Sequence, residues 1–167
     1  MGDPVTDTAI SAAQGLSRVP ASGSARGGYV LAEGRRPSRP PWCRDGGTPD
    51  VILLATGSEV DVALAAREQL HADGISTRVV SMPCRELFER QSQQYRDDVL
   101  PPSVTARVAV ERAPTLGWDR YVGTDDAVAG IHTFGALTHR KLLVEFGFTS
   151  DQVAQAARDR LAAVRRR

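Results

Sequence analysis

The residues that could carry chemistry stand where apolar segments end, and the first is a turn of Thr, Gly, Ser and Glu at 56–59. A strand-to-helix turn with a glycine directs backbone amides at an anion, so Gly57 and Ser58 are candidate ligand positions. The chain has neither a GxGxxG nor a GxxxxGK[ST] motif, and Thr56 and Glu59 have the spacing of a capping box. We therefore expect a self-capped joint here, with phosphate binding as the alternative.

Other reactive side chains follow further apolar segments. His132 comes after a short one, where α/β sheets often place functional residues, but no histidine stands in an HxxE, HxH or HExxH pattern. A loop-packing role is therefore favoured for His132. Cys84 follows Pro83, and the sequence around it offers no partner that would activate a thiol. Asp125 and Asp126 are adjacent, so they point in different directions and are typical of a turn.

Glu111 and Trp118 complete the set of candidate ligand or interface positions. Glu111 ends an apolar segment and, with Gly57 and Pro83, marks the carboxyl ends of three predicted strands. Ligands bind at such ends in open α/β sheets. Trp118 and Tyr121 share one face of a short predicted helix, which indicates a core or interface role rather than a stacking platform. No catalytic residue is predicted.

The elements that would position these residues alternate between strand and helix. The apolar run 51–56 has β-branched residues and the length of a strand buried on both faces. Apolar residues then recur at helical spacing as far as Leu70, and Gly74 suits the position that ends a helix. Strands are predicted at 28–33, 51–56, 75–82, 104–111 and 127–131, and further helices at 84–100 (one or two), 116–122, 138–146 and 150–163. The last helix has its own capping box, Thr149 to Gln152.

This alternation predicts an α/β fold, a three-layer α/β/α sandwich with a mostly parallel sheet of about five strands. The first strand is reached by a loop and not by a crossover helix, so it is expected to lie antiparallel at an edge. Residues 1–26 are predicted to be a weakly structured lead-in and 27–163 one domain. Within it, 34–48 form a loop rich in Pro and Arg, and 164–167 are a basic tail.

Composition excludes several classes of protein. The chain has 167 residues, 41% hydrophobic and 25% charged, with a net charge of +1. One domain with a proper core fits this length, and the charge balance gives no reason to expect nucleic-acid binding. Cys43 and Cys84 form no CxxC pattern, so neither a disulfide framework nor a zinc site is predicted. No apolar run reaches the ~18 residues of a membrane span, so a cytoplasmic location is expected.

Several blocks of the sequence, in order, resemble the C-terminal domain of transketolases. They are GGYVL, PDVILLATGSEVDVAL, RVVSMPCRELFERQ, YRDDVLPPSV, ARVAVE, GWDRYVG, FGA and FGFT, between Gly27 and about Ala163. One departure lies at Gly130 to Leu137, where GIHTFGAL replaces the family's GIDRFGAS, so His132 and Thr133 stand for an Asp-Arg pair.

The resemblance implies part of an enzyme that transfers two-carbon ketol units between sugar phosphates. The full-length family uses thiamine diphosphate and a divalent metal, which its other two domains bind, so no cofactor is expected in this chain. The first hypothesis is a structural or assembly module that pairs with the missing domains on another chain or forms a homodimer. The alternatives are a small-ligand regulatory module near Gly57, Pro83 and Glu111, and a gene remnant without a role.

Overall fold

The computed structural model describes residues 21–34, 48–111, 117–122, 128–130 and 149–166, and these form a five-stranded sheet with helices on both faces. The strands are β1 (Tyr29–Ala32), β2 (Val51–Ala55), β3 (Thr77–Ser81), β4 (Arg107–Glu111) and β5 (Val128–Gly130). Their order is β1-β3-β2-β4-β5, with β1 antiparallel to β3 and the other pairs parallel. The predicted α/β class and the antiparallel edge strand are confirmed.

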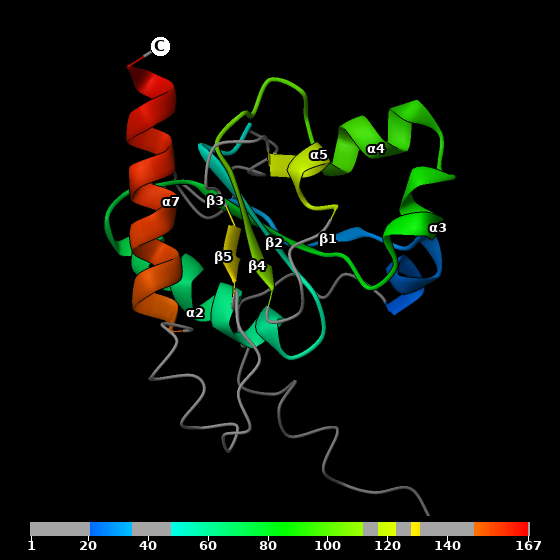
Figure 1. Ribbon diagram of the computed structural model, residues 1–167, viewed down its shortest axis with the longest axis horizontal. Coiled ribbons are helices and arrows are strands. Elements are labelled where there is room, and N and C mark those ends of the chain that lie inside the picture. Colours follow the sequence, from blue (N-terminus) through cyan, green and yellow to red (C-terminus); the bar gives the residue numbers. More distant parts are fainter. Residues whose placement is uncertain (1–20, 35–47, 112–116, 123–127, 131–148, 167) are drawn as a thin grey trace, which may run out of the picture.

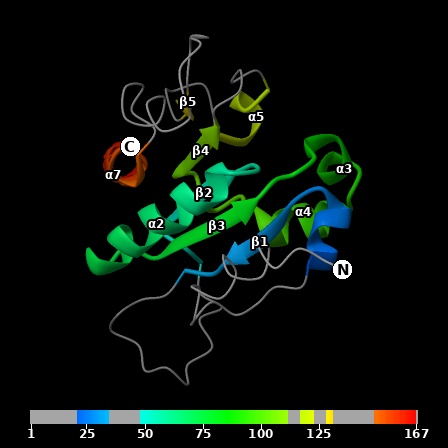
Figure 2. The same ribbon diagram turned by 90° about the horizontal axis from the view of Figure 1, so that it is seen from below.

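Helices cover the two faces of the sheet unequally (Figures 1 and 2). The two long helices lie on one face, and three short helices lie on the other. On the first face are α2 (Glu59–Ala72) and α7 (Ser150–Arg165), and on the second are α3 (Arg85–Glu89), α4 (Gln93–Val99) and α5 (Asp119–Val122). The predicted three-layer sandwich is therefore confirmed, while the helix expected at 138–146 falls outside the described residues.

Strand β2 lies at the centre of the sheet, and all five of its residues are buried. Because side chains alternate along a strand, Leu53 packs with α2 and α7 while Ile52 and Leu54 pack with the short helices. A strand covered on both faces must be apolar at every position, which explains the unbroken run of hydrophobic residues seen in the sequence.

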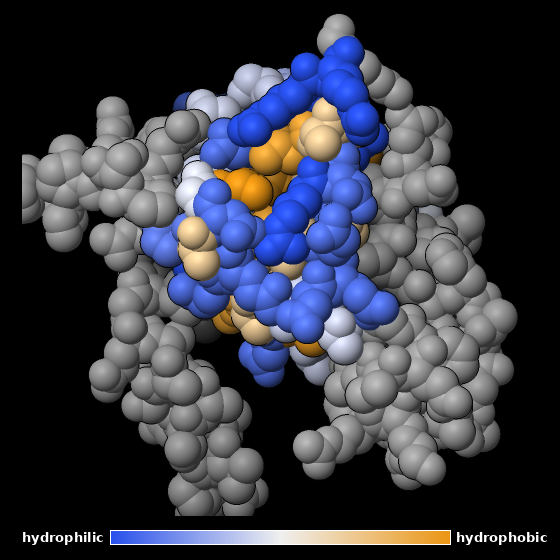
Figure 3. Space-filling model, turned by 90° about the vertical axis from the view of Figure 1, so that its left-hand side faces the viewer, coloured by the Kyte–Doolittle hydropathy of each residue, from blue (hydrophilic) through white to orange (hydrophobic). Residues whose placement is uncertain are grey.

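The layer of α2 and α7 is built from small side chains. Ala63 and Ala66 of α2 and Ala154 and Ala157 of α7 are buried in one cluster with Leu70 and the valines of the sheet. Small side chains allow two helices to lie close together while their outer faces stay polar. Seen from the α7 side, hydrophilic side chains surround a hollow in which apolar residues are visible (Figure 3).

The ends of α2 and α7 show two of the predicted signals. Thr149 caps α7, because its side chain accepts a hydrogen bond from the amide of Gln152, as expected from the capping box. Gly74 follows α2 with a φ of +78°, and its amide donates to the carbonyl of His71. A positive φ after the last turn is the geometry that favours glycine there.

The amino-terminal part of the domain wraps around the edge of the sheet. The 3₁₀ helix η1 (Ala21–Arg26) belongs to the stretch predicted as a weakly structured lead-in, and it contacts α3 before β1 begins. The amide of Cys84 donates to the carbonyl of Gly27, and the Tyr95 hydroxyl donates to that of Gly28 at 2.8 Å. These bonds fix residues 27 and 28 against the short helices.

Candidate functional site

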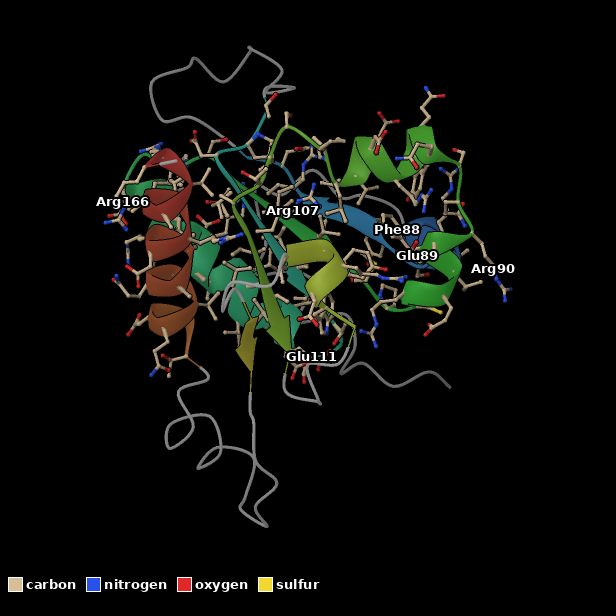
Figure 4. All side chains as sticks on the ribbon, turned by 45° about the horizontal axis from the view of Figure 1, so that its top comes forward. Phe88, Glu89, Arg90, Arg107, Glu111 and Arg166 are labelled. Atoms are coloured by element: carbon tan, nitrogen blue, oxygen red, sulfur yellow. The ribbon has the colours of Figure 1, made fainter. Side chains whose placement is uncertain are left out.

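The inner strands β2 and β4 end side by side on the side of the sheet that holds the carboxyl ends of its parallel strands. Thr56 and Glu111 form a hydrogen bond there. The two strands are parallel neighbours in which Ala55 pairs with Val110, so the next two residues, Thr56 and Glu111, lie side by side. The Thr56 hydroxyl donates to Glu111 Oε2 at 2.7 Å, and Figure 4 shows Glu111 at this end of β4. The sheet thus joins two residues that are 55 positions apart in the chain.

This bond corrects the predicted capping box at Thr56 to Glu59. The residue before α2 is Ser58, which makes no side-chain cap bond, and the Thr56 hydroxyl is engaged with Glu111 instead. In a capping box the Thr56 hydroxyl would accept a hydrogen bond from the Glu59 amide, but that amide donates to the Thr56 carbonyl. The sequence predicted that Gly57 and Glu111 mark the carboxyl ends of parallel strands, but only the pairing of β2 with β4 makes Glu111 the direct neighbour of Thr56.

The turn after β2 nevertheless has hydrogen bonds of its own. The amide of Glu59 donates to the Thr56 carbonyl at 3.0 Å, and the Ser58 hydroxyl donates to the Glu59 carboxylate at 3.1 Å. Glu59 is buried in the first turn of α2, where the helix dipole favours a negative charge. A buried carboxylate therefore already supplies negative charge at the start of α2, which disfavours an anionic ligand there. Gly57 is exposed with a φ of +49°, and glycine suits that conformation.

Trp118 belongs to the core, as one of its two sequence interpretations expected. Only 1% of the residue is exposed, and its ring lies 5.9 Å from that of Tyr121 in an edge-on arrangement. The Arg85 guanidinium lies 5.3 Å from the centre of the indole ring. Trp118 is thus not available to a ligand at the surface, while His132 falls outside the described residues.

Cys84 stands at the end of the segment after β3, close to a carboxylate. Its thiol lies 3.4 Å from Glu86 Oε2. A backbone hydrogen bond and, to a lesser extent, the Cys84 side chain hold the pKa of Glu86 below its usual value. Within the described residues, the pair lacks the histidine that commonly activates a nucleophilic cysteine.

A polar network beneath α5 was not anticipated from the sequence. The Tyr121 hydroxyl donates to Glu89 Oε1 at 2.6 Å, and Glu89 Oε2 accepts from Arg96 at 3.1 Å. Burial, followed by the hydrogen bond to Glu89, raises the pKa of Tyr121 to about 12. Figure 4 shows Glu89 and Phe88 on α3, facing α5. The residues come from three separate helices, so no local spacing could have signalled the network.

The donor set at the sheet edge does not fit thiamine diphosphate and its metal, the groups that the family resemblance implies. Within the described part of the chain, no three His, Cys, Asp or Glu side chains group closely enough to hold a metal ion. Of the carboxylates at this end of the sheet, Glu111 is bonded to Thr56 and Glu59 to Ser58. As a separate observation, none of the helices in the described part of the chain is long and apolar enough to cross a membrane.

Comparisons with known proteins agree on one family. The family profile of the transketolase-like TK C-terminal domain matches residues 27–149. The transketolase of Mycobacterium tuberculosis (strain H37Rv) is 48% identical over 145 residues, which cover 85% of this chain and 20% of that protein. The chain thus spans about a fifth of the length of the curated relatives it matches.

Solved structures show the same relation. A transketolase from Pichia stipitis has a TM-score of 0.74 and 30% identity, over 90% of this chain and 20% of that one. A protein described as a split-gene transketolase, an inactive beta4 tetramer, has a TM-score of 0.58 and 23% identity, over 81% of this chain and 42% of that one. At that identity, the second likeness shows the fold alone.

Proposed function

Because the chain belongs to the transketolase family, through the C-terminal domain of that family, we propose that it is a structural and assembly module of a ketol-transferring enzyme. The enzyme moves two-carbon ketol units between sugar phosphates, as in the pentose phosphate pathway, in the cytoplasm. Thiamine diphosphate and its metal are held by domains that lie outside these 167 residues. The chain supplies no catalytic group of its own.

The observation that carries this proposal is the extent of the match. The profile that fits the chain is that of the C-terminal domain, and the matched part is about a fifth of the relatives' length. The carboxyl ends of β2 and β4 support the same assignment. Thr56 and Glu111, polar side chains there, form a structural hydrogen bond with each other. The alternative of a regulatory ligand site near Gly57 and Ser58 has less support, since the buried Glu59 carboxylate already lies in that turn and bonds to Ser58.

The remaining domains stand on the same polypeptide or on a companion chain. The fold recurs in a protein described as a split-gene transketolase, so a companion chain is a reasonable arrangement. In either arrangement, the contribution of this domain is to pack on its neighbours and to hold the assembly together.

Two measurements test the proposal. The M. tuberculosis transketolase, shortened to end before its matching region, is co-expressed with the full 167-residue chain. We expect the two to co-purify and ketol transfer to exceed that of the shortened enzyme alone. Full-length M. tuberculosis transketolase is the control, since its own C-terminal domain already fills the place. Failure to co-purify would contradict the assembly role.

The second measurement concerns the cofactor. Calorimetric titration of the chain with thiamine diphosphate and Mg²⁺ is expected to give no binding heat, because the described donor set does not suit them. Micromolar affinity would overturn the assignment of the cofactor to other domains.

A further inference from the structure

Residues 21–28 cross one end of the short helices before β1 begins, and we call them the strap. The strap consists of η1 (Ala21–Arg26) and the two glycines that follow it. Figures 1 and 2 both place η1 beside α3, at the end of the molecule opposite α7. Glycine at position 23 lets the strap pass close to the Tyr29 ring, because a Cβ atom there would meet that ring. The strap therefore lies against both β1 and the short helices.

Cys84 and Tyr95 fasten the strap to α3 and α4. The amide of Cys84, just before α3, donates to the Gly27 carbonyl at 3.0 Å. The Tyr95 hydroxyl, on α4, donates to the Gly28 carbonyl at 2.8 Å. The Arg26 guanidinium lies 4.8 Å from the centre of the same Tyr95 ring, within the distance of a cation–π contact. Tyr95 thus holds the strap through both its ring and its hydroxyl.

The closed strap covers part of the apolar core. Gly27 has a φ of +82°, and a Cβ atom there would meet the Cys84 carbonyl oxygen and the Phe88 amide. At Gly28, a Cβ atom would meet the side chains of Met82 and Phe88. Each of these two residues is only 1% exposed. Two glycines in succession therefore allow the strap to seal this part of the core, which favours the closed state.

The strap itself buries little apolar surface. Ser24, Ala25 and Arg26 are exposed, and Gly27 and Gly28 are buried but have no side chain. By contrast, all five residues of β2 are buried. Because apolar burial is the dominant favourable contribution to folding, release of the strap is expected to cost far less free energy than unfolding of the sheet. Segments with few buried side chains are those that open locally in native proteins.

We propose that the strap is a conformational latch, which detaches from α3 and α4 while the sheet stays folded, and that Tyr95 controls how often it opens. Opening breaks the hydrogen bonds to Gly27 and Gly28 and uncovers Phe88 and Met82. The chain is then fixed to the domain from β1 onward instead of from η1. The latch is a property of this chain alone and does not depend on the assembly role.

Hydrogen exchange of two backbone amides, followed by NMR, tests the latch. The Cys84 amide reports on the strap because it bonds to Gly27, and the Ile52 amide reports on the sheet because it donates to the Ala106 carbonyl, also at 3.0 Å. After correction for intrinsic rates, Cys84 is expected to exchange at least about a hundredfold faster than Ile52. Urea below the unfolding transition should accelerate Ile52 much more than Cys84, since local opening exposes less surface than unfolding does.

A matched pair of variants tests the part played by Tyr95, because each removes one tyrosine hydroxyl from a short helix. Tyr95→Phe loses the bond to the strap and should accelerate Cys84 exchange about three- to tenfold, the range expected for one ordinary hydrogen bond. Tyr121→Phe loses a bond to Glu89 instead. It should change Cys84 exchange by less than about twofold, because the contacts of the strap stay intact.

Each measurement can overturn the latch. Equal acceleration of the two amides by urea would show that the strap opens only when the sheet unfolds. Exchange of the Cys84 amide at the rate of an unprotected amide would show that the strap is not closed. If Tyr95→Phe accelerates Cys84 exchange no more than Tyr121→Phe does, Tyr95 does not control the latch. None of these outcomes affects the assembly role, which co-purification tests.

Discussion

The two faces of the sheet are covered in different ways, although the same strands form both. On one face lie the long helices α2 and α7, whose buried alanines belong to one core cluster. On the other, three short helices pack through aromatic rings, with Phe88 and Tyr121 at 6.3 Å between ring centres. Long helices satisfy most of their backbone groups internally, whereas short helices leave a larger share of theirs without an internal partner.

Arginines of the sheet provide those partners on the second face. Arg78 donates to the carbonyls of Asp98 and Val99 at the end of α4, at 2.8 and 3.0 Å. Arg107 donates to the carbonyls of four residues, namely Leu100, Pro101, Val104 and Tyr121. Burial lowers the pKa of Arg107, and charge-assisted hydrogen bonds offset the cost of placing its guanidinium there.

The first face has side-chain bonds too, such as that from Arg158 to Asp73 at 2.6 Å, which joins the side chains of α7 and the end of α2. On the second face, the arginines of the sheet bond to backbone carbonyls at the ends of short helices.

The largest expected effect is on the aromatic face. Trp118→Ala removes the largest fully buried side chain among the described residues and should destabilise the protein by about 3–5 kcal/mol, since a cavity remains among short helices. Urea denaturation followed by circular dichroism measures the loss. Trp118→Phe should lose less stability than Trp118→Ala, because phenylalanine keeps part of the ring volume. A loss below about 1 kcal/mol for the alanine variant would mean that this face does not depend on its rings.

A smaller effect is expected where the long helices meet. Ala66→Leu adds volume to a fully buried position in the cluster shared by α2 and α7, and overpacking of this kind costs about 1–3 kcal/mol. The adjacent Ala65 is exposed, so Ala65→Leu serves as the matched control and should change stability by less than about 0.5 kcal/mol. Equal effects of the two changes in thermal unfolding would show that the alanine contact is not close-packed.

The smallest effect tests the polar network. Tyr121→Phe removes the hydrogen bond to Glu89 and should cost about 1–2 kcal/mol near pH 8, because Glu89 keeps its pairing with Arg96. The raised pKa of Tyr121 also predicts a pH dependence, since the folded state favours the neutral phenol. The stabilisation that comes from the neutral, hydrogen-bonded phenol of Tyr121 is complete below pH 10 and is lost as the pH rises toward about 12.

The pH dependence is measured by urea denaturation between pH 9 and 12. The unmodified chain should lose stability over this range more steeply than Tyr121→Phe, which lacks the titrating group. Identical profiles for the two proteins would exclude Tyr121 as a source of the alkaline loss.

Much of the fold was predictable from local patterns. The unbroken apolar run at 51–55 indicated a central strand because a strand with both faces covered excludes polar residues. The candidate site was less predictable. Trp118 could be assigned only to core or interface, and its contacts with Tyr121 and Arg85 depend on how α3 and α5 pack. Helical spacing reports which residues share a face, but not which element that face meets.

The two predicted capping boxes, at 56–59 and at 149–152, had different outcomes in the structure. The sequence by itself determined the α/β class, the antiparallel edge strand and the cap at Thr149, because each depends on local spacing or on the length of a connection. Thr56 stands in the same motif, yet its hydroxyl bonds to Glu111. Only the tertiary structure decided that outcome, since the pairing of β2 with β4 placed Glu111 beside the Thr56 hydroxyl, whereas the Thr149 hydroxyl accepts from the amide of Gln152.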